Sequence, residues 1–250
     1  LSIAEERKFP IDTLKLLASA RSEGRELRFR DQIIKVHEVS EKELEGVDLV
    51  FCSASSEVSR TWGPWCRENQ VMMIDDGSAF RMDDDVPLVV PEINSEDLAY
   101  HNWIVSIPNC TTTPLVMALD AMRQVNPISR VTATTYQAVS GTGAAAIAEL
   151  QNQDISIANG DPSPRPEAYP VQIARNVLPH VDDFEEDGFT KEELKMRNET
   201  RKILHDYELR FASTCVRVPV LYGHSEVVHV EFENQVSIES LGQALNDYPG

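Results

Sequence analysis

Cys110 stands in the stretch SIPNCTTTP, immediately before the apolar helical pattern LVMALDAM. A cysteine where a helix begins faces unpaired backbone N–H groups and the positive end of the helix dipole, which favour the thiolate over the thiol. Asn109 and Thr111 add side-chain donors for developing negative charge. A lone cysteine is more often a small buried hydrophobe. Two interpretations therefore stand side by side, a packing residue and a nucleophile.

A nucleophilic cysteine needs a base, and histidine is the usual partner. Among the six histidines, His224 follows Gly223 at the end of a predicted strand, which is the kind of loop position from which a site is built. His180 precedes Asp182 and Asp183, but no further ligand is evident, so an acidic turn is favoured over a metal site. The remaining cysteines are far apart and form no CxxC pair, which argues against a disulfide or zinc framework.

The elements that must position these residues change character along the chain. In the first hundred residues, apolar runs at 12–19, 32–39, 47–54 and 71–80 predict strands, with a helix within 60–70. Strand, serine-rich turn, helix and strand form a crossover unit. This half therefore predicts a doubly wound α/β arrangement.

The second half predicts a separate α+β arrangement with a mostly antiparallel sheet. Thr190 and Glu193 form a capping box for an exposed helix. The predicted elements are a helix over 110–125, a strand over 130–139, a helix over 144–153, a Pro/Gly-rich connection over 154–170, a helix over 190–207 and long alternating strands over 209–224 and 226–236.

Composition limits the function classes. The formal net charge is -18 at pH 7, with no stripe of Lys and Arg, which argues against nucleic acid or anionic lipid as a partner. No uncharged apolar run approaches the roughly 18 residues of a membrane helix, and LSIAEERKFP lacks the layout of a signal peptide. We therefore expect a cytoplasmic protein.

Six separated segments carry a resemblance. They are DDGSAFRMDDDVPLVVPEIN, SIPNCTTTPLVMAL, TTYQAVSGTG, ARNVLPHVDDF, TKEELKMRNETRKIL and CVRVPVLYGHSE. In this order and spacing the chain resembles bacterial-type aspartate-semialdehyde dehydrogenase over essentially all of its 250 residues. The resemblance implies an α/β fold, with a Rossmann-like NADP-binding domain over 1–108 and a catalytic and dimerisation domain over 109–250. It also implies a homodimer.

The resemblance implies NADPH-dependent reductive dephosphorylation of L-aspartyl 4-phosphate to L-aspartate 4-semialdehyde, in the biosynthesis of lysine, diaminopimelate, threonine, methionine and isoleucine. Cys110 matches the nucleophile that forms a thioester, His224 the acid/base and Gln137 the amide that orients the substrate. Arg217 matches the arginine that binds the substrate carboxylate, where a guanidinium can bind in bidentate fashion. Asn109 is placed with these substrate-binding residues.

Three further residues match charged ligands of the substrate. Glu192 matches the acceptor for the substrate ammonium, while Lys195 and Arg81 match phosphate ligands. From their own spacing, Glu192 and Lys195 favour a plain surface pair on one helical face. Their functional roles therefore come from the resemblance.

The cofactor assignment rests on two short segments. Ser19, Arg21 and Ser22 follow a predicted strand, where a Ser/Arg set can receive the 2′-phosphate of NADP; the alternative is an ordinary polar loop. Ser140 and Gly141 match the turn on the nicotinamide side.

The chain also departs from the pattern. The resemblance implies a first strand and a glycine-rich turn that would precede Leu1, and a further segment after Gly250, so the sequence is expected to be a fragment. From this we expect weak NADPH binding and marginal folding of the 250-residue chain. Tight NADPH binding by the purified chain would contradict that expectation.

Three alternatives remain open from the residues. The first is reduction of another acyl phosphate, as by N-acetyl-glutamyl-phosphate reductase or a phosphorylating glyceraldehyde-3-phosphate dehydrogenase. The second is a dimerisation module that does not turn over, and the third is a cysteine hydrolase, which would leave the dinucleotide-type first half without a purpose.

Overall fold

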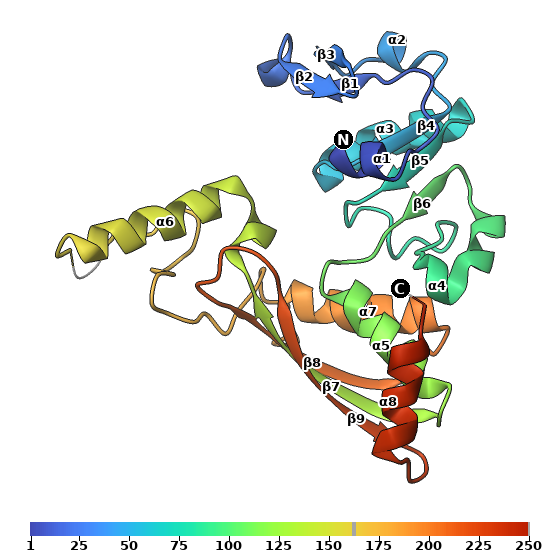
Figure 1. The fold of residues 1–250 in the computed structure, drawn as a ribbon, viewed down its shortest axis with the longest axis vertical. Helices are drawn as coiled ribbons and strands as arrows, with labels where there is room; N and C mark the ends of the chain where they lie inside the picture. Colours follow the sequence, from blue (N-terminus) through green and yellow to red (C-terminus); the bar gives the residue numbers. More distant parts are fainter. Residues whose placement is uncertain (162–163, 250) are drawn as a thin grey trace. The chain divides into compact units, whose positions relative to one another are not determined.

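The fold is described from a computed structural model, which covers residues 1–161 and 164–249. The chain divides into two compact units, Leu1–Val50 and Phe51–Gly250. The colours of Figure 1 follow the chain through both units.

The first unit is built on a small sheet with strand order β1-β3-β2. β1 (Leu16–Ala18) pairs parallel with β3 (Gln32–Glu38), and β2 (Glu26–Phe29) pairs antiparallel with it. Phe29, Val36 and Leu44 are its buried apolar side chains. Its helical segments are α1 (Ser2–Glu6), the 3-10 turn η1 (Ala20–Ser22) and α2 (Glu41–Leu44).

The first sheet of the second unit has strand order β4-β5-β6. Its strands are β4 (Leu49–Cys52), within which the chain passes from the first unit to the second, β5 (Met72–Asp75) and β6 (Ile104–Ser106), and β5 pairs parallel with β6. Met73 and Ile104 are wholly buried, as expected where a parallel sheet is covered on both faces. Its helical segments are α3 (Ser56–Glu68), α4 (Pro91–Asn94) and the 3-10 segment η2 (Ser95–Tyr100).

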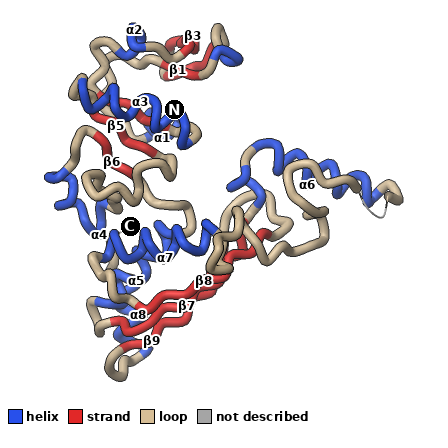
Figure 2. Tube along the Cα trace, turned by 180° about the vertical axis from the view of Figure 1, so that it is seen from behind, coloured by secondary structure: helices blue, strands red, loops and turns tan. Residues whose placement is uncertain are grey.

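The second sheet has the long strand β7 (Ile128–Gln137) at its centre, between β8 (Arg210–Arg217) and β9 (Ser225–Phe232). Two helices, α5 (Thr112–Arg123) and α7 (Lys191–Leu204), pack on this sheet, and Figure 2 shows them beside the three strands. The shared core includes Leu115, Leu119, Val131, Ala133, Met196 and Cys215. This apolar core holds both helices against β7 and β8. These two strands end in the polar residues Gln137 and Arg217.

The remaining helical segments of the second unit are η3 (Val139–Thr142), α6 (Ala144–Ala158) and α8 (Ile238–Asp247). α8 packs against α5, where the Tyr248 hydroxyl lies 2.6 Å from Asp120 Oδ2. No helix among residues 1–161 and 164–249 is long and apolar enough to cross a membrane.

The predicted elements are present, with three differences. β8 pairs parallel with β7 and only β9 pairs antiparallel, so the second sheet is mixed and not mostly antiparallel. α6 continues to Ala158, into the predicted connection, because nothing before Asn159 and Gly160 interrupts the helix. α3 begins at Ser56, because Ser55 caps it by accepting from Val58 N. The predicted connection also includes residues 162 and 163, which lie outside the described residues.

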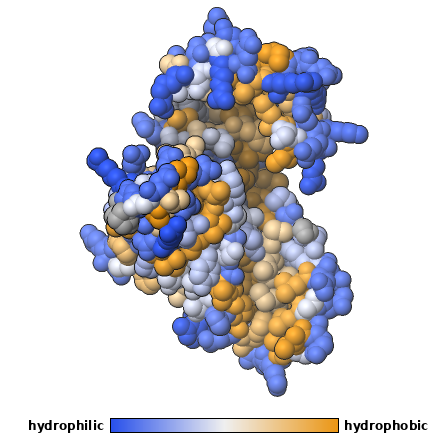
Figure 3. Space-filling view, turned by 60° about the vertical axis from the view of Figure 1, so that its left-hand side comes forward, coloured by the Kyte–Doolittle hydropathy of each residue, from blue (hydrophilic) through white to orange (hydrophobic). Residues whose placement is uncertain are grey.

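Hydrophobic side chains also reach the surface, as the orange areas of Figure 3 show on one face. On the side of the second sheet away from α5 and α7, Tyr136 is 42% exposed and Val227 is 48% exposed. These two side chains belong to the central strand and to one of its neighbours.

Candidate active site

Cys110 lies in the short segment that joins β6 to α5. The preceding residue, Asn109, is buried, and its Oδ1 accepts from the Thr111 backbone N–H at 2.9 Å and from the Thr111 hydroxyl at 2.8 Å. The Asn109 carbonyl accepts from Thr113 N at 3.0 Å, which starts the helical turn. The polar residues around the cysteine therefore form a closed local network that holds the thiol at the mouth of α5.

The surroundings of Cys110 favour the thiol. Burial is the largest cause that raises the pKa of Cys110, and the negative charge of Glu192 adds to it. The backbone N–H groups of Cys110 and Thr111 and the charge of Arg81 act in the opposite direction, with smaller effect. The side chain is nevertheless open to solvent. The helix start thus lowers the pKa of Cys110 as expected, but burial and the charge of Glu192 outweigh this effect, so the net shift is upward.

His224 follows Gly223, whose φ of 84° lies in the left-handed region that favours glycine. The imidazole Nδ1 accepts from the Ala138 backbone N–H at 3.0 Å. Because a backbone N–H can only donate, the neutral ring carries its proton on Nε2. Burial, followed by the charge of Arg217, lowers the pKa of His224. The imidazole is thus neutral. Its Nε2–H is the donor that remains available to a ligand in the pocket.

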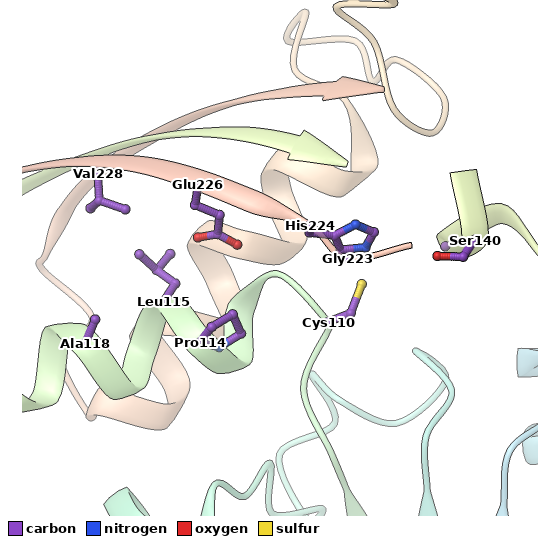
Figure 4. A pocket seen from close by; sticks show the side chains of 10 residues that line it. Cys110, Pro114, Leu115, Ala118, Ser140, Gly223, His224, Glu226 and Val228 are labelled. Atoms are coloured by element: carbon purple, nitrogen blue, oxygen red, sulfur yellow. The ribbon is translucent and has the colours of Figure 1, made fainter. Parts of the chain in front are cut away.

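Cys110 and His224 line one pocket of about 670 Å³. Figure 4 shows the Cys110 sulfur pointing toward the His224 ring, with Ser140 on one side and Glu226 on the other. The other lining residues are Pro114, Leu115, Ala118, Gly141, Gly223 and Val228. One end of the pocket is therefore polar, and the other is apolar.

Arg217 and Gln137 lie side by side at the ends of two paired strands, β8 and β7. Arg217 is 7% exposed, and its Nη1 donates to the Ala138 carbonyl at 2.7 Å. Within residues 1–161 and 164–249, no carboxylate forms an ion pair with it. A buried guanidinium without a counter-ion is costly, and the cost is recovered when an anion binds. This arrangement points to an anion site beside the pocket.

The Glu192 carboxylate joins three segments of the site. Its Oε1 accepts from Asn109 Nδ2 at 3.0 Å and from Gln137 Nε2 at 3.1 Å, and its Oε2 lies 3.4 Å from Lys195 Nζ. It therefore belongs to the buried network, and a plain surface pair with Lys195 does not describe it.

Lys195 also forms an ion pair with Asp182, at 2.7 Å from Nζ to Oδ2. Its other acidic partner is Glu192, so two carboxylates flank this ammonium group. Asp183 pairs with Lys191 on the surface. Both acidic residues that follow His180 are thus engaged by lysines of α7.

Arg81 is also buried, but a carboxylate neutralises it. Its Nη1 donates to Glu199 Oε1 at 3.0 Å, while its Nε donates to the Ile107 carbonyl and its Nη2 to the Asp76 carbonyl, each at 2.9 Å. These three bonds leave two of its five N–H groups for a ligand.

Comparisons with known proteins all match this chain to semialdehyde dehydrogenases. Residues 1–101 match the family described as "Semialdehyde dehydrogenase, NAD binding domain", and residues 119–250 match "Semialdehyde dehydrogenase, dimerisation domain". The aspartate-semialdehyde dehydrogenase of Aquifex aeolicus is 46% identical over 253 residues, which cover 100% of this chain and 74% of that protein. That of Bacillus subtilis is 42% identical, with the same shares covered.

The crystal structure of aspartate semialdehyde dehydrogenase II from Vibrio cholerae is similar with a TM-score of 0.96 and 42% identity, over 99% of this chain and 74% of that one. The chain belongs to the aspartate-semialdehyde dehydrogenase family. The family membership and the α/β fold class predicted from the sequence are thereby confirmed. The NAD-binding match also shows that the family takes a nicotinamide cofactor.

The domain boundary after residue 108 stays a prediction. It falls in the interval 102–118 between the two family matches, whereas the compact units divide after Val50.

The second unit brings together most of the residues that the family resemblance singles out. Asn109, Cys110, Gln137, Glu192, Lys195, Arg217 and His224 form one continuous set of contacts and pocket walls with Ser140 and Gly141. Arg81 is connected to the Cys110 segment through the Ile107 carbonyl. Ser19, Arg21 and Ser22 lie in the first unit, at the end of β1.

Gly141 lies in the turn η3, where space is limited. A Cβ at this position would lie 3.2 Å from Arg217 Nη1 and 3.2 Å from His224 Cε1. The turn therefore lets the backbone lie close to the guanidinium and the imidazole, which a Cβ would obstruct.

Sequence reasoning missed Glu199 and Glu226. Glu199 lies in the NETRKI segment, but its bonds to Arg81 and Asn109 join distant parts of the chain. Glu226 lines the pocket, and burial raises its pKa to about 7. Its position two residues after His224 was the available signal, because alternate residues of a strand share a face.

Proposed function

We propose that this chain reduces L-aspartyl 4-phosphate to L-aspartate 4-semialdehyde with NADPH, releasing phosphate. The observation that carries the proposal is Arg217, a buried cation with no carboxylate partner among the described residues, beside the pocket of Cys110 and His224. Family membership supports the same reaction. A second Vibrio cholerae structure, 42% identical with a TM-score of 0.97, is described as complexed with ASA.

The amino acid end of the substrate fits the charges on either side of Gln137. Arg217 binds the α-carboxylate, and Glu192 accepts from the α-ammonium in place of one of its present donors. Both groups are fixed by backbone or amide contacts before the substrate arrives. Such preorganisation reduces the entropy that binding would otherwise cost.

Cys110 carries the chemistry. The Cys110 thiol, which is open to solvent, gives its proton to water in the pocket. Sγ then attacks the acyl carbon of the substrate, an S–C bond forms, and the C–O bond to the phosphate breaks with release of inorganic phosphate. Arg81 and Lys195 bind the phosphoryl oxygens, since both lie on the segments that surround Cys110. The Nε2–H of His224 donates to the oxyanion that develops at the acyl carbon.

Bound NADPH would supply the hydride to the acyl carbon of the thioester, after which the C–S bond breaks, the aldehyde leaves and Cys110 is regenerated as a thiolate. Ser140 and Gly141 would receive the nicotinamide end, because both line the pocket of Cys110 and His224. For NADP over NAD, the support is Arg21, which is exposed and has no hydrogen bond or ion pair to any described residue. A free guanidinium beside Ser19 and Ser22 suits a 2′-phosphate.

The proposed reaction is tested in the phosphorylating direction. Purified protein is supplied with inorganic phosphate, NADP and, in turn, aspartate semialdehyde, N-acetyl-glutamate semialdehyde and glyceraldehyde 3-phosphate. We expect turnover with aspartate semialdehyde and its loss in C110S. Preference for the acetylated substrate would contradict the proposal, because an acetylated amine gives Glu192 no cation to bind.

Cofactor preference is tested by direct binding. The fluorescence change of NADPH and NADH is titrated with the protein and with Arg21→Ala. We expect Arg21→Ala to weaken NADPH binding and to leave NADH binding unchanged. Equal weakening of both would contradict the role of Arg21.

We also propose that the chain forms a homodimer through the region matched to the dimerisation domain. The exposed Tyr136 and Val227 on the free face of the second sheet support an interface there. Light scattering of the wild-type protein and of Tyr136→Lys tests it. A monomeric wild-type protein at micromolar concentration would contradict it.

A further inference from the structure

Glu199 is the most deeply buried carboxylate of the site, with 1% of its side chain exposed. It projects from α7, and its two oxygens bind two other segments. Oε1 accepts from Arg81 Nη1 at 3.0 Å, and Oε2 accepts from the Asn109 backbone N–H at 2.7 Å. Arg81 is 118 residues away in the sequence. One side chain thus connects the residue before the nucleophile to a buried cation.

Arg81 also binds the segment that precedes Cys110. Its Nε donates to the carbonyl of Ile107, two residues before Asn109. The ion pair of Arg81 with Glu199 therefore holds both ends of the segment 107–109, to which Cys110 is attached. A shift of the guanidinium relative to this segment would break at least one of these bonds.

A buried ion pair is weak evidence for a contribution to stability, because desolvation of two charges offsets their attraction. Glu193 provides the comparison on the same helix. It is also buried, yet its bonds go to Thr190 N and Cys215 N and serve only the helix cap and strand β8. Glu199, in contrast, uses one oxygen to bind the Asn109 backbone, next to Cys110, and the other to bind Arg81, which is itself bonded to Ile107 of the same segment.

We infer that Glu199 is a positioning residue, which fixes the Arg81 guanidinium and the Asn109 backbone relative to each other and so places anion-binding donors beside Cys110. The inference rests on the proposed function, in which Arg81 binds the phosphoryl group. Gln at this position cannot replace Glu, because an amide has one acceptor oxygen and its NH₂ would face a donor.

The test is protection of Cys110 from iodoacetamide by inorganic phosphate, followed by mass spectrometry of the Cys110 peptide. It needs neither cofactor nor turnover. We expect phosphate to protect the wild-type protein and the half-protecting concentration to rise about 10-fold in E199Q, because the donors lose their alignment. The matched control E193Q removes another buried carboxylate from the same helix and should stay within about twofold of the wild type.

The outcomes separate the possibilities. If Glu199 only neutralises Arg81, then E199Q leaves a free cation, and phosphate protects at a lower concentration than in the wild type. That result, or unchanged protection in E199Q, overturns the inference alone. Absence of protection in the wild type overturns the phosphate role of Arg81 and, with it, this inference. Should E199Q not fold, E199D keeps the charge with a shorter reach, and its half-protecting concentration is expected to rise as well.

Discussion

Cys110 and His224 each lie near a charge that opposes their ionised form. Glu192 raises the pKa of the Cys110 thiol and Arg217 lowers the pKa of the His224 imidazole, in both cases adding to the larger effect of burial. The resting pair is therefore a thiol beside a neutral imidazole. A zwitterionic substrate end would neutralise both opposing charges at once, so binding itself would favour ionisation of the thiol.

Replacement of Glu192 by Gln tests this coupling. Removing the negative charge should lower the pKa of Cys110 and speed its alkylation at pH 7.5 by about 3- to 10-fold, while substrate turnover falls. The rate is measured by iodoacetamide labelling across a range of pH. Glu193→Gln, on the same helix, is the control and should leave the rate unchanged. A slower reaction in Glu192→Gln would contradict the electrostatic effect.

Arg217 gives a second prediction for a single residue. Arg217→Met should lower kcat/KM by about 100- to 1000-fold, in line with the loss of a buried charge pair with the substrate. The same change should leave folding stability equal or higher, because it removes a buried cation without a counter-ion. Steady-state kinetics and urea unfolding measure the two effects. Arg210→Met, at the exposed start of β8, is the control.

At the scale of elements, the sequence predicted individual helices and strands, but it did not predict how the strands pair. The capping box of α7 is confirmed because Thr190 and Glu193 are neighbours in sequence, and their reciprocal bonds need no other element. Alternation over 209–224 predicted a strand, but it carries no information on direction. β8 runs parallel to β7 because α7 returns the chain to the same end of the sheet.

The residues of the site show the same contrast between local motifs, which the sequence reveals, and contacts between distant elements, which it does not. The residues of the Cys110 segment, of β8 and of the His224 turn were singled out from the sequence, because each lies in a distinctive local motif. The direction of the pKa shift of Cys110 could not be read from the sequence, since it depends on burial by the tertiary fold and on Glu192, which approaches from another element. Glu199 was missed for the same reason, because its partners are defined only by the tertiary fold.

The turn η3 gives a prediction at this scale. Gly141→Ala would place a Cβ 3.2 Å from both Arg217 Nη1 and His224 Cε1, so one of these side chains must shift. We expect about a 10-fold loss of kcat/KM with little change in folding stability. Gly242→Ala in α8 is the control, since nothing lies within 4 Å of its added Cβ, and helix propensity predicts a gain of about 1 kcal/mol. Full activity of Gly141→Ala would contradict the tight approach.

At the scale of the whole molecule, Glu226 links folding stability to pH. Its pKa is raised to about 7 by burial, against an ordinary value of 4.5, so the folded protein holds this proton after the unfolded chain has lost it. Stability is therefore expected to fall as the pH rises from about 4.5 to about 7, by roughly 3 kcal/mol for this group.

Glu226→Gln removes that dependence. The variant should be more stable than the wild type at pH 8, by up to about 3 kcal/mol, and nearly equal to it at pH 4.5. Urea unfolding at both pH values measures the difference. A destabilisation of similar size at both values would show that the Glu226 carboxyl has a hydrogen-bonding role that the amide cannot fill.

The unpaired guanidinium of Arg217 also has a practical consequence. It accepts any small carboxylate that reaches the pocket, so acetate, citrate or succinate buffers are expected to compete with the substrate. Apparent KM values measured in such buffers would then reflect the buffer as much as the protein. Amine buffers with chloride avoid this competition, and a succinate molecule at Arg217 would be a natural first occupant to look for in a crystal.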